Sequence, residues 1–147
     1  VIGHVLAALE LAGQIAAPPD AIVVPLGTGG TAAGIALGMA WLRWPTRVVA
    51  VRVAPRIVAN RWRTLRLARK AAALLGQPAA TLRLQVVDGL GRGYGHPTAE
   101  GERAAALAAT HGVRLDPTYT AKAFAVFGHP VMDTVERAVF WLTFAWP

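Results

Sequence analysis

The stretch Ile22–Gly38, IVVPLGTGGTAAGIALG, contains the residues of this chain that are best suited to holding an anion. It joins an apolar run to a segment of small residues through three glycines and two threonines: Gly27, Thr28, Gly29, Gly30 and Thr31. Glycines let the backbone approach a ligand closely, and the threonines add hydroxyl donors. A helix beginning near Gly30 or Thr31 also offers unpaired backbone N–H groups and the positive end of its dipole. The loop is therefore predicted to cradle a phosphate.

Two common phosphate-binding motifs do not fit this loop. A Walker loop needs a lysine after its last glycine, and none follows here. The dinucleotide pattern Gly-x-Gly-x-x-Gly has Ala32 where its third glycine belongs. The variant that ends in alanine stays possible, but Ala50, Val51 and Arg52 occupy the region about 20 positions on where an acidic residue is expected. A tight strand-to-helix turn without a ligand stays open as the alternative.

Two further segments, GRGYGHPTAEG and VRLDPTYTAKAF, each carry a tyrosine, Tyr94 and Tyr119. An unperturbed phenol is a poor base at neutral pH, so proton transfer by either one requires a lowered pKa or a cationic partner. The alternative is a half-buried ring whose hydroxyl is satisfied locally. The sequence predicts no metal site, because the chain has no cysteine and its histidines show no ligand spacing: His4, His96, His111 and His129.

The elements that must position these residues alternate between strand and helix. Helices are expected over 1–15, 31–44, from the basic segment to about residue 75, and over 99–110, with a short helix after Tyr119. Strands are expected over 21–26, 46–54, 81–87 and 138–145. This order predicts an α/β fold with a parallel sheet, in which ligands lie beyond the carboxyl ends of the strands. The glycine loop follows Leu26 at such an end.

The net charge of +7 raises the question of a nucleic-acid partner, because six basic residues lie in RIVANRWRTLRLARK, 56–70. We favour an amphipathic helix whose arginines face water, so no nucleic acid is expected. Its apolar stripe toward the sheet would consist of Val58, Trp62, Leu65, Ala68, Ala72 and Leu75. The segment from Ala21 to Leu42 carries no charge and is long enough to span a membrane, but Pro25 and the glycine loop interrupt it. A buried strand, loop and helix explain it better, and a cytoplasmic protein without a membrane partner is expected.

Taken together, GTGGTAAGIALG, GRGYGHPTAEG and VRLDPTYTAKAF resemble, in order, the D-cysteine desulfhydrase and 1-aminocyclopropane-1-carboxylate deaminase family. That resemblance implies pyridoxal 5′-phosphate as cofactor and a tryptophan-synthase-β-like fold, fold type II, with a three-layer parallel sheet flanked by helices. It extends over nearly the whole chain but only over the C-terminal half of a family member. Residues 1–147 are therefore expected to be the C-terminal portion of the large domain, an incomplete fold lacking the N-terminal half and its Schiff-base lysine. Because the chain begins with Val1, a fragment or a processed product is expected.

The resemblance also implies roles for individual residues. The cofactor phosphate would be held by Gly27, Thr28, Gly29, Gly30 and Thr31. Tyr94 and Tyr119 would be active-site tyrosines, Tyr119 with a role in proton transfer. Thr120 would contact the pyridine nitrogen, where the deaminases carry glutamate. A hydroxyl gives a weaker electron sink than a carboxylate at that nitrogen, which favours β-elimination from D-cysteine or another small amino acid over ring-opening deamination.

Several residues depart from the family pattern. Ala121 stands where the family has a glycine, and FWLTFAWP stands where the family closes with His-Thr-Gly-Gly. Thr143 would retain the place of the threonine, but Leu142 and Phe144 alter the pocket, so substrate identity cannot be carried over. Lys122 matches the lysine of the family's YTGK motif and not the cofactor anchor. Without the cofactor anchor, the chain is expected to be inactive alone. The full-length protein is expected to form a homodimer. The alternative is a non-catalytic α/β domain that binds a phosphorylated ligand or a partner.

Overall fold

The computed structural model describes residues 1–78 and 81–143, which form a parallel sheet with helices on both faces. The strands are β1 (Ala21–Leu26), β2 (Arg47–Arg52), β3 (Leu84–Asp88) and β4 (Ala138–Phe140), in the order β3-β2-β1-β4. Every described strand pair is parallel. Parallel neighbours require crossover connections, and the helices supply them. The α/β fold expected from the sequence is confirmed.

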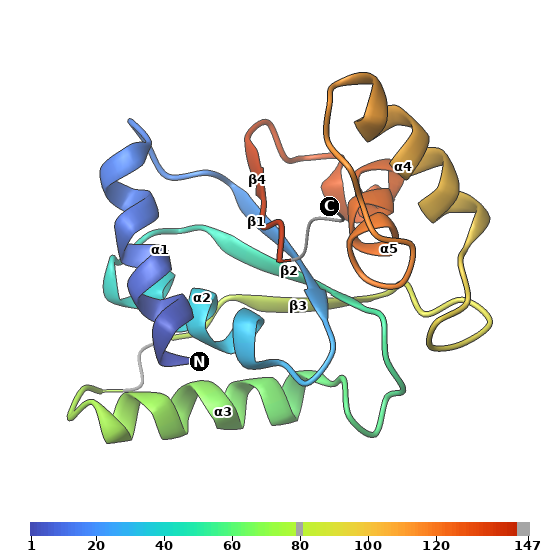
Figure 1. Cartoon of the computed structure of the whole chain (residues 1–147). Coiled ribbons are helices and arrows are strands. Elements are labelled where there is room, and N and C mark those ends of the chain that lie inside the picture. Colours follow the sequence, from blue (N-terminus) through green and yellow to red (C-terminus); the bar gives the residue numbers. More distant parts are fainter. Residues whose placement is uncertain (79–80, 144–147) are drawn as a thin grey trace.

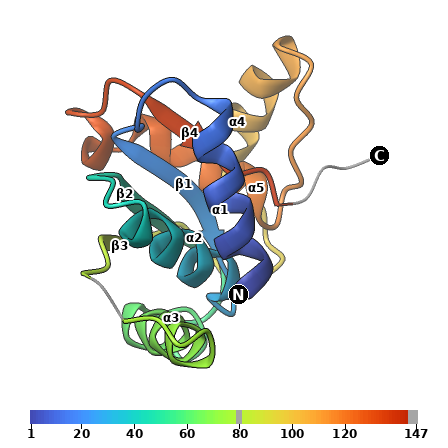
Figure 2. The same cartoon turned by 90° about the vertical axis from the view of Figure 1, so that its left-hand side faces the viewer.

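The helices form two layers (Figures 1 and 2). On one face lie α1 (Ile2–Gln14), α2 (Gly30–Trp41) and α3 (Arg61–Leu74); on the other lie α4 (Ala99–Thr110) and α5 (Thr120–Phe124). Two 3-10 turns, Ala125–Gly128 and Pro130–Met132, follow α5. The alternation of side chains along a strand explains the layering, since Ile22 and Val24 pack in the core under α1–α3 while Ala21 and Val23 pack with the α5 side.

Glycines bring α1 unusually close to α2. A Cβ atom built at Gly38 would lie 2.6 Å from the Cβ atom of Ala8, and one at Gly34 would lie 2.7 Å from the Cβ atom of His4. The two helices therefore touch along their backbones, and any larger residue at these positions would force them apart. This contact fixes the position of α1 over the first turns of α2.

The structure corrects the apolar stripe expected on the basic helix. Trp62 is 64% exposed and Leu75 is 39% exposed, whereas Leu65, Ala68 and Ala72 are buried as expected. The reason is that α3 packs on α2 through small residues, with Ala68, Ala71 and Ala72 against Ala33 and Leu37. Trp62 lies outside this contact and instead stacks against the Arg66 guanidinium, 5.4 Å from the ring centroid.

Element bounds differ from expectation mainly at the chain's C-terminal end. The last strand ends at Phe140, not at 145, and residues 144–145 lie outside the described residues. The short β4 is held to β1 where both begin, because the Asp20 carboxylate accepts the backbone N–H groups of Glu136 at 3.0 Å and Arg137 at 2.9 Å. Within the described residues, no helix is both long and apolar enough to cross a bilayer.

Candidate cofactor-phosphate site

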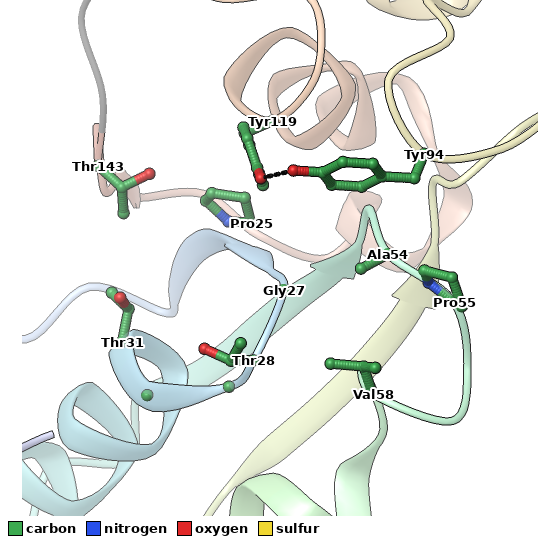
Figure 3. A pocket seen from close by; sticks show the side chains of 12 residues that line it. Pro25, Gly27, Thr28, Thr31, Ala54, Pro55, Val58, Tyr94, Tyr119 and Thr143 are labelled. Carbon is green, nitrogen blue, oxygen red and sulfur yellow. Dashed lines mark hydrogen bonds between the residues drawn. The ribbon is translucent and has the colours of Figure 1, made fainter.

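A cavity of about 550 Å³ opens beyond the carboxyl ends of β1 and β2 (Figure 3). It is lined by the end of β1, the glycine loop, the turn after β2, the residue before α5, Thr143, and the loop between β3 and α4 that carries Tyr94 (the tyrosine loop). The lining residues are Pro25, Gly27, Thr28, Gly29, Gly30, Thr31, Ala54, Pro55, Val58, Tyr94, Tyr119 and Thr143. None of these described lining residues carries a formal charge at neutral pH. The cavity lies where a ligand of an open parallel sheet is expected.

The backbone of the glycine loop is shaped to receive an anion. Gly29 has a φ of 88°, which side-chain-bearing residues rarely adopt, and a Cβ atom there would lie 2.7 Å from Thr64 Oγ1. The first helical hydrogen bond of α2 runs from Ala33 N–H to the Gly29 carbonyl at 2.9 Å. The N–H groups of Gly30, Thr31 and Ala32 therefore precede the helical bonds and remain available to a ligand.

Two other residues of the loop, Gly27 and Thr31, lie next to side chains from other parts of the chain. A Cβ atom at Gly27 would lie 4.0 Å from the Tyr119 ring, so a longer side chain would extend into the space between loop and ring. Thr31 Oγ1 lies 3.0 Å from His4 Nε2, which reaches over from α1. Burial lowers the pKa of His4.

The two tyrosines expected in the site meet at the cavity. Their hydroxyls hydrogen-bond to each other, and their rings lie edge to face with centroids 5.9 Å apart (Figure 3). The hydrogen bond to Tyr94, and next to it partial burial, raises the pKa of Tyr119. Tyr119 therefore keeps its proton at neutral pH, and its hydroxyl is suited to donate a proton or hydrogen bond rather than to act as a base.

Thr120, by contrast, does not line the cavity in the described structure. It is fully buried, and its hydroxyl lies 2.5 Å from Asp116 Oδ2 and 2.8 Å from the Asp116 backbone nitrogen. Asp116 also accepts the backbone N–H groups of Thr118, Tyr119 and Thr120 at 2.7–3.0 Å. In this arrangement Thr120 and Asp116 build the turn that presents Tyr119, and the contact between Thr120 and a ring nitrogen stays a prediction.

Sequence analysis missed the wall formed by Ala54, Pro55 and Val58. These residues follow β2, and the rule that ligands lie at the carboxyl ends of neighbouring strands could have pointed to them. The turn is held by Arg52, which donates to the Ala59 carbonyl at 2.8 Å and to Asp88 at 2.9 Å. Thr143 also lines the cavity, whereas Leu142 does not, and Phe144 lies outside the described residues. The described residues contain no cluster of His, Cys, Asp or Glu able to hold a metal.

Residues 1–141 match the family described as pyridoxal-phosphate dependent enzyme, and this match decides the assignment. The chain belongs to this family. Nocardicin C-9′ epimerase of Nocardia uniformis subsp. tsuyamanensis is 38% identical over 97% of this chain and 45% of its own length. D-cysteine desulfhydrase of Yersinia enterocolitica serotype O:8 / biotype 1B is 34% identical over 95% of this chain and 42% of its own length.

A solved structure gives the same result for the fold. The crystal structure of an ACC deaminase homologue is 31% identical, covers 95% of this chain and 43% of its own chain, and has a TM-score of 0.81. The resemblance to the desulfhydrase and deaminase family and the fold expected from it are thus confirmed. The chain spans less than half the length of the curated relatives it matches.

The residues present fit the phosphate and ring of the family cofactor, pyridoxal phosphate. The loop supplies N–H and hydroxyl donors, and Pro25, Pro55 and Val58 supply an apolar wall. The chain's two lysines are placed elsewhere: Lys70 is exposed on α3, and Lys122 is 2% exposed. Lys122 Nζ donates to the carbonyls of Leu90 at 2.9 Å and Gly93 at 3.1 Å, and burial lowers its pKa. Lys122 therefore anchors the loop that carries Tyr94.

Proposed function

We propose that this chain is the part of a pyridoxal-phosphate-dependent lyase that holds the cofactor's phosphate, and that the whole protein acts on a small amino acid. Residues 1–147 would form the C-terminal portion of the large domain, and the full-length protein would be a homodimer. The observation that carries the proposal is the glycine loop at the cavity. The loop offers the free N–H groups that precede the helical bonds of α2, the left-handed backbone of Gly29, and the hydroxyls of Thr28 and Thr31, all of which suit a phosphate.

The bound cofactor supplies an electron sink for bonds at the α-carbon of an amino acid. The roles of this chain follow from its own residues. Backbone N–H groups at the start of α2, with Thr28 and Thr31, hold the phosphate dianion. Tyr119, protonated and hydrogen-bonded to Tyr94, is placed to donate a proton to a group in the cavity. Pro25, Pro55 and Val58 exclude water from the apolar side.

The favoured reaction is β-elimination of the D-cysteine desulfhydrase kind. It is supported by the 34% identity with a D-cysteine desulfhydrase and by threonine, rather than glutamate, at position 120. In β-elimination the α-proton and the β-substituent leave, and Tyr119 would supply the proton that the departing thiolate needs.

Epimerisation is a second candidate, because a relative with 38% identity is an epimerase. Epimerisation returns a proton to the α-carbon on the opposite side, and a phenol that keeps its proton at neutral pH could provide it. A non-catalytic phosphate-binding domain is the third candidate. It is supported by the placement of both lysines, neither of which lines the described cavity, so that this chain alone would be inactive.

Binding by the isolated chain tests the phosphate site. Pyridoxine 5′-phosphate carries the ring and phosphate but no aldehyde, so it cannot react with surface lysines. Calorimetry should show that it binds at least about tenfold more tightly than pyridoxine, because the phosphate gains several charge-assisted hydrogen bonds. Thr28→Ala should remove part of that difference. Equal affinities for the two compounds would refute the proposed site.

The reaction is tested on the longest natural form of the protein, isolated with its cofactor. Hydrogen sulfide release from D-cysteine, with L-cysteine as control, identifies β-elimination. Exchange of the α-proton for deuterium in D₂O without sulfide release, together with inversion of the amino acid, identifies epimerisation. Absence of both activities in cofactor-loaded protein would favour the binding domain. Light scattering on the same sample tests the homodimer.

A further inference from the structure

The described residues that line the cavity carry no positive charge that could balance a bound phosphate. A phosphate ester carries close to two negative charges at neutral pH, yet none of the described residues lining the cavity is cationic. The dipole of α2 supplies only about half a positive charge. The imidazole of His4, which reaches the loop from α1, is a titratable group that forms a hydrogen bond with the Thr31 side chain of the loop.

The position of His4 is imposed by the close contact of α1 and α2. Gly34 lies one turn after Thr31 on α2, and an added Cβ there would lie 2.7 Å from His4 Cβ and would also contact the Val1 carbonyl. This contact sets His4 over the first turn of α2, so that its Nε2 atom lies 3.0 Å from Thr31 Oγ1. The interaction joins residues 27 positions apart and therefore depends on the tertiary contact.

The direction of this hydrogen bond decides what Thr31 can offer an anion. A hydroxyl has one hydrogen and can accept through its lone pairs. If His4 Nε2 lacks a hydrogen, Thr31 must donate to it, and only lone pairs are left for the loop. If Nε2 carries a hydrogen, it donates to Thr31 Oγ1, and the hydroxyl hydrogen is released for the phosphate.

We propose that His4 is a phosphate-positioning residue, which donates its Nε2 hydrogen to Thr31 Oγ1 and so turns the Thr31 hydroxyl hydrogen toward the anion. The role rests on the proposed phosphate site and adds a pH-dependent regulation to it. Both the neutral Nε2–H tautomer and the imidazolium can act in this way, and the imidazolium adds a positive charge one hydroxyl away from the dianion.

The surroundings of His4 determine the sign of the pH dependence. Without ligand, burial keeps the pKa of His4 low. The other titratable side chain on α1 is Glu10, nearly two turns further along, and α2, the helix packed against α1, has none. A dianion in the loop favours the charged imidazolium, so phosphate binding takes up a proton and strengthens as the pH falls.

The test compares the affinity of wild type, His4→Phe and His4→Gln for inorganic phosphate, measured by calorimetry at about pH 8 and about pH 6. Phenylalanine fills the space but can neither orient the Thr31 hydroxyl nor carry a positive charge. Thr31 can still donate to the anion, so binding should weaken by roughly three- to tenfold, less than the full value of a charge-assisted hydrogen bond. Glutamine can place an N–H near the position of Nε2 and should retain most of the affinity. The ratio of wild-type to His4→Gln affinity should rise toward pH 6, and this ratio cancels the ionisation of phosphate itself.

A second measurement does not depend on how much the variants alter stability. Nitrogen-15 spectra of wild type, with the His4 signals identified by their loss in His4→Gln, should show hydrogen on Nε2 once phosphate is added. Wild-type affinity in a folded His4→Phe variant, or an unprotonated Nε2 with phosphate bound, would overturn the role of His4 while leaving the phosphate site intact. Phosphate binding that Thr28→Ala leaves unchanged would place the anion outside the loop and overturn the proposed function as well.

Discussion

The side-chain hydroxyls of Tyr94 and Tyr119, which both line the cavity, hydrogen-bond to each other although the residues are 25 positions apart. Tyr94 comes from the loop after β3 and Tyr119 from the turn before α5. The bond joins the two chain segments that carry the aromatic side of the site, and it is the largest cause of the raised pKa of Tyr119.

The first prediction concerns that pKa. The chain has two tyrosines, so in Tyr94→Phe only Tyr119 titrates as a phenol. The hydrogen bond to Tyr94 is the largest cause of the raised pKa of Tyr119, and its loss should return that pKa toward the ordinary value of about 10. Phenolate absorbance followed against pH measures it, with circular dichroism as the folding control. A pKa for Tyr119 that stays raised in the variant would show that burial, not the pair, is responsible.

A second prediction distinguishes two reasons for glycine at position 29, namely the positive φ and the lack of space for a Cβ atom. Gly29 and Gly76 both have positive φ, 88° and 65°, but a Cβ at Gly76 meets open space whereas one at Gly29 meets Thr64. Gly76→Ala should cost about 1–2 kcal/mol for the left-handed backbone alone. Gly29→Ala should cost about 1–3 kcal/mol more through the clash.

Urea unfolding of both variants gives these two costs. Gly29→Ala should also reduce phosphate affinity, while Gly76→Ala, far from the loop in sequence and exposed, should not. Equal destabilisation by the two substitutions would mean that Thr64 moves aside without cost.

Lys122 is predicted to hold the tyrosine loop in place. Lys122→Met fills a similar volume but leaves the Leu90 and Gly93 carbonyls without their donor, which should destabilise the fold by about 1–3 kcal/mol. The loop should open more often, so an arginine-specific protease should cleave after the exposed Arg92 faster than in wild type. Lys70→Met removes an exposed lysine of α3 and is the matched control. Cleavage at the wild-type rate in Lys122→Met would remove this role from the lysine.

The role of Thr120 is tested by comparing serine and valine. Thr120→Val removes the hydroxyl from a buried position and leaves Asp116 without that partner, so stability should fall by about 1–3 kcal/mol, while Thr120→Ser should retain most of it. If the hydroxyl also reaches the pyridine nitrogen, Thr120→Val should weaken binding of pyridoxine 5′-phosphate more than binding of inorganic phosphate. Equal effects on the two ligands would confine Thr120 to the turn that presents Tyr119.

The lowered pKa of His4 predicts how acid affects the ligand-free chain. As the pH falls through about 6.5, the unfolded chain binds a proton at this residue before the folded chain does. Protonation therefore favours unfolding, and wild type should lose stability on acidification relative to His4→Gln. Thermal unfolding at several pH values measures the difference, which saturating phosphate should reverse in sign. A difference that does not change with pH would mean that folding leaves the pKa of His4 unaltered.

The sequence by itself determined the order of elements and the place of the phosphate loop. Apolar runs such as Ala21–Leu26 and the small-residue helix after Gly29 are recognisable from hydrophobicity and glycine content, because these are local properties of the chain. The helix expected over about 99–110 is Ala99–Thr110 in the structure, where Thr98 caps it by accepting the Gly101 N–H. The exposed Trp62 was missed because the face that α3 buries depends on the alanines it presents to α2, not on its own periodicity.

Only the tertiary structure decided which side chains meet. Tyr94 with Tyr119, Lys122 with the Leu90 carbonyl, and His4 with Thr31 are all pairs of residues from separate segments. Their spacing in sequence carries no signal, because the distance between them is set by the packing of helices on a sheet. Thr120 shows that adjacent residues of one motif can also differ. Tyr119 lines the cavity, whereas the Thr120 hydroxyl turns inward to Asp116. A local motif can name the residues of a site, but the direction in which each side chain points depends on what the folded chain places around it.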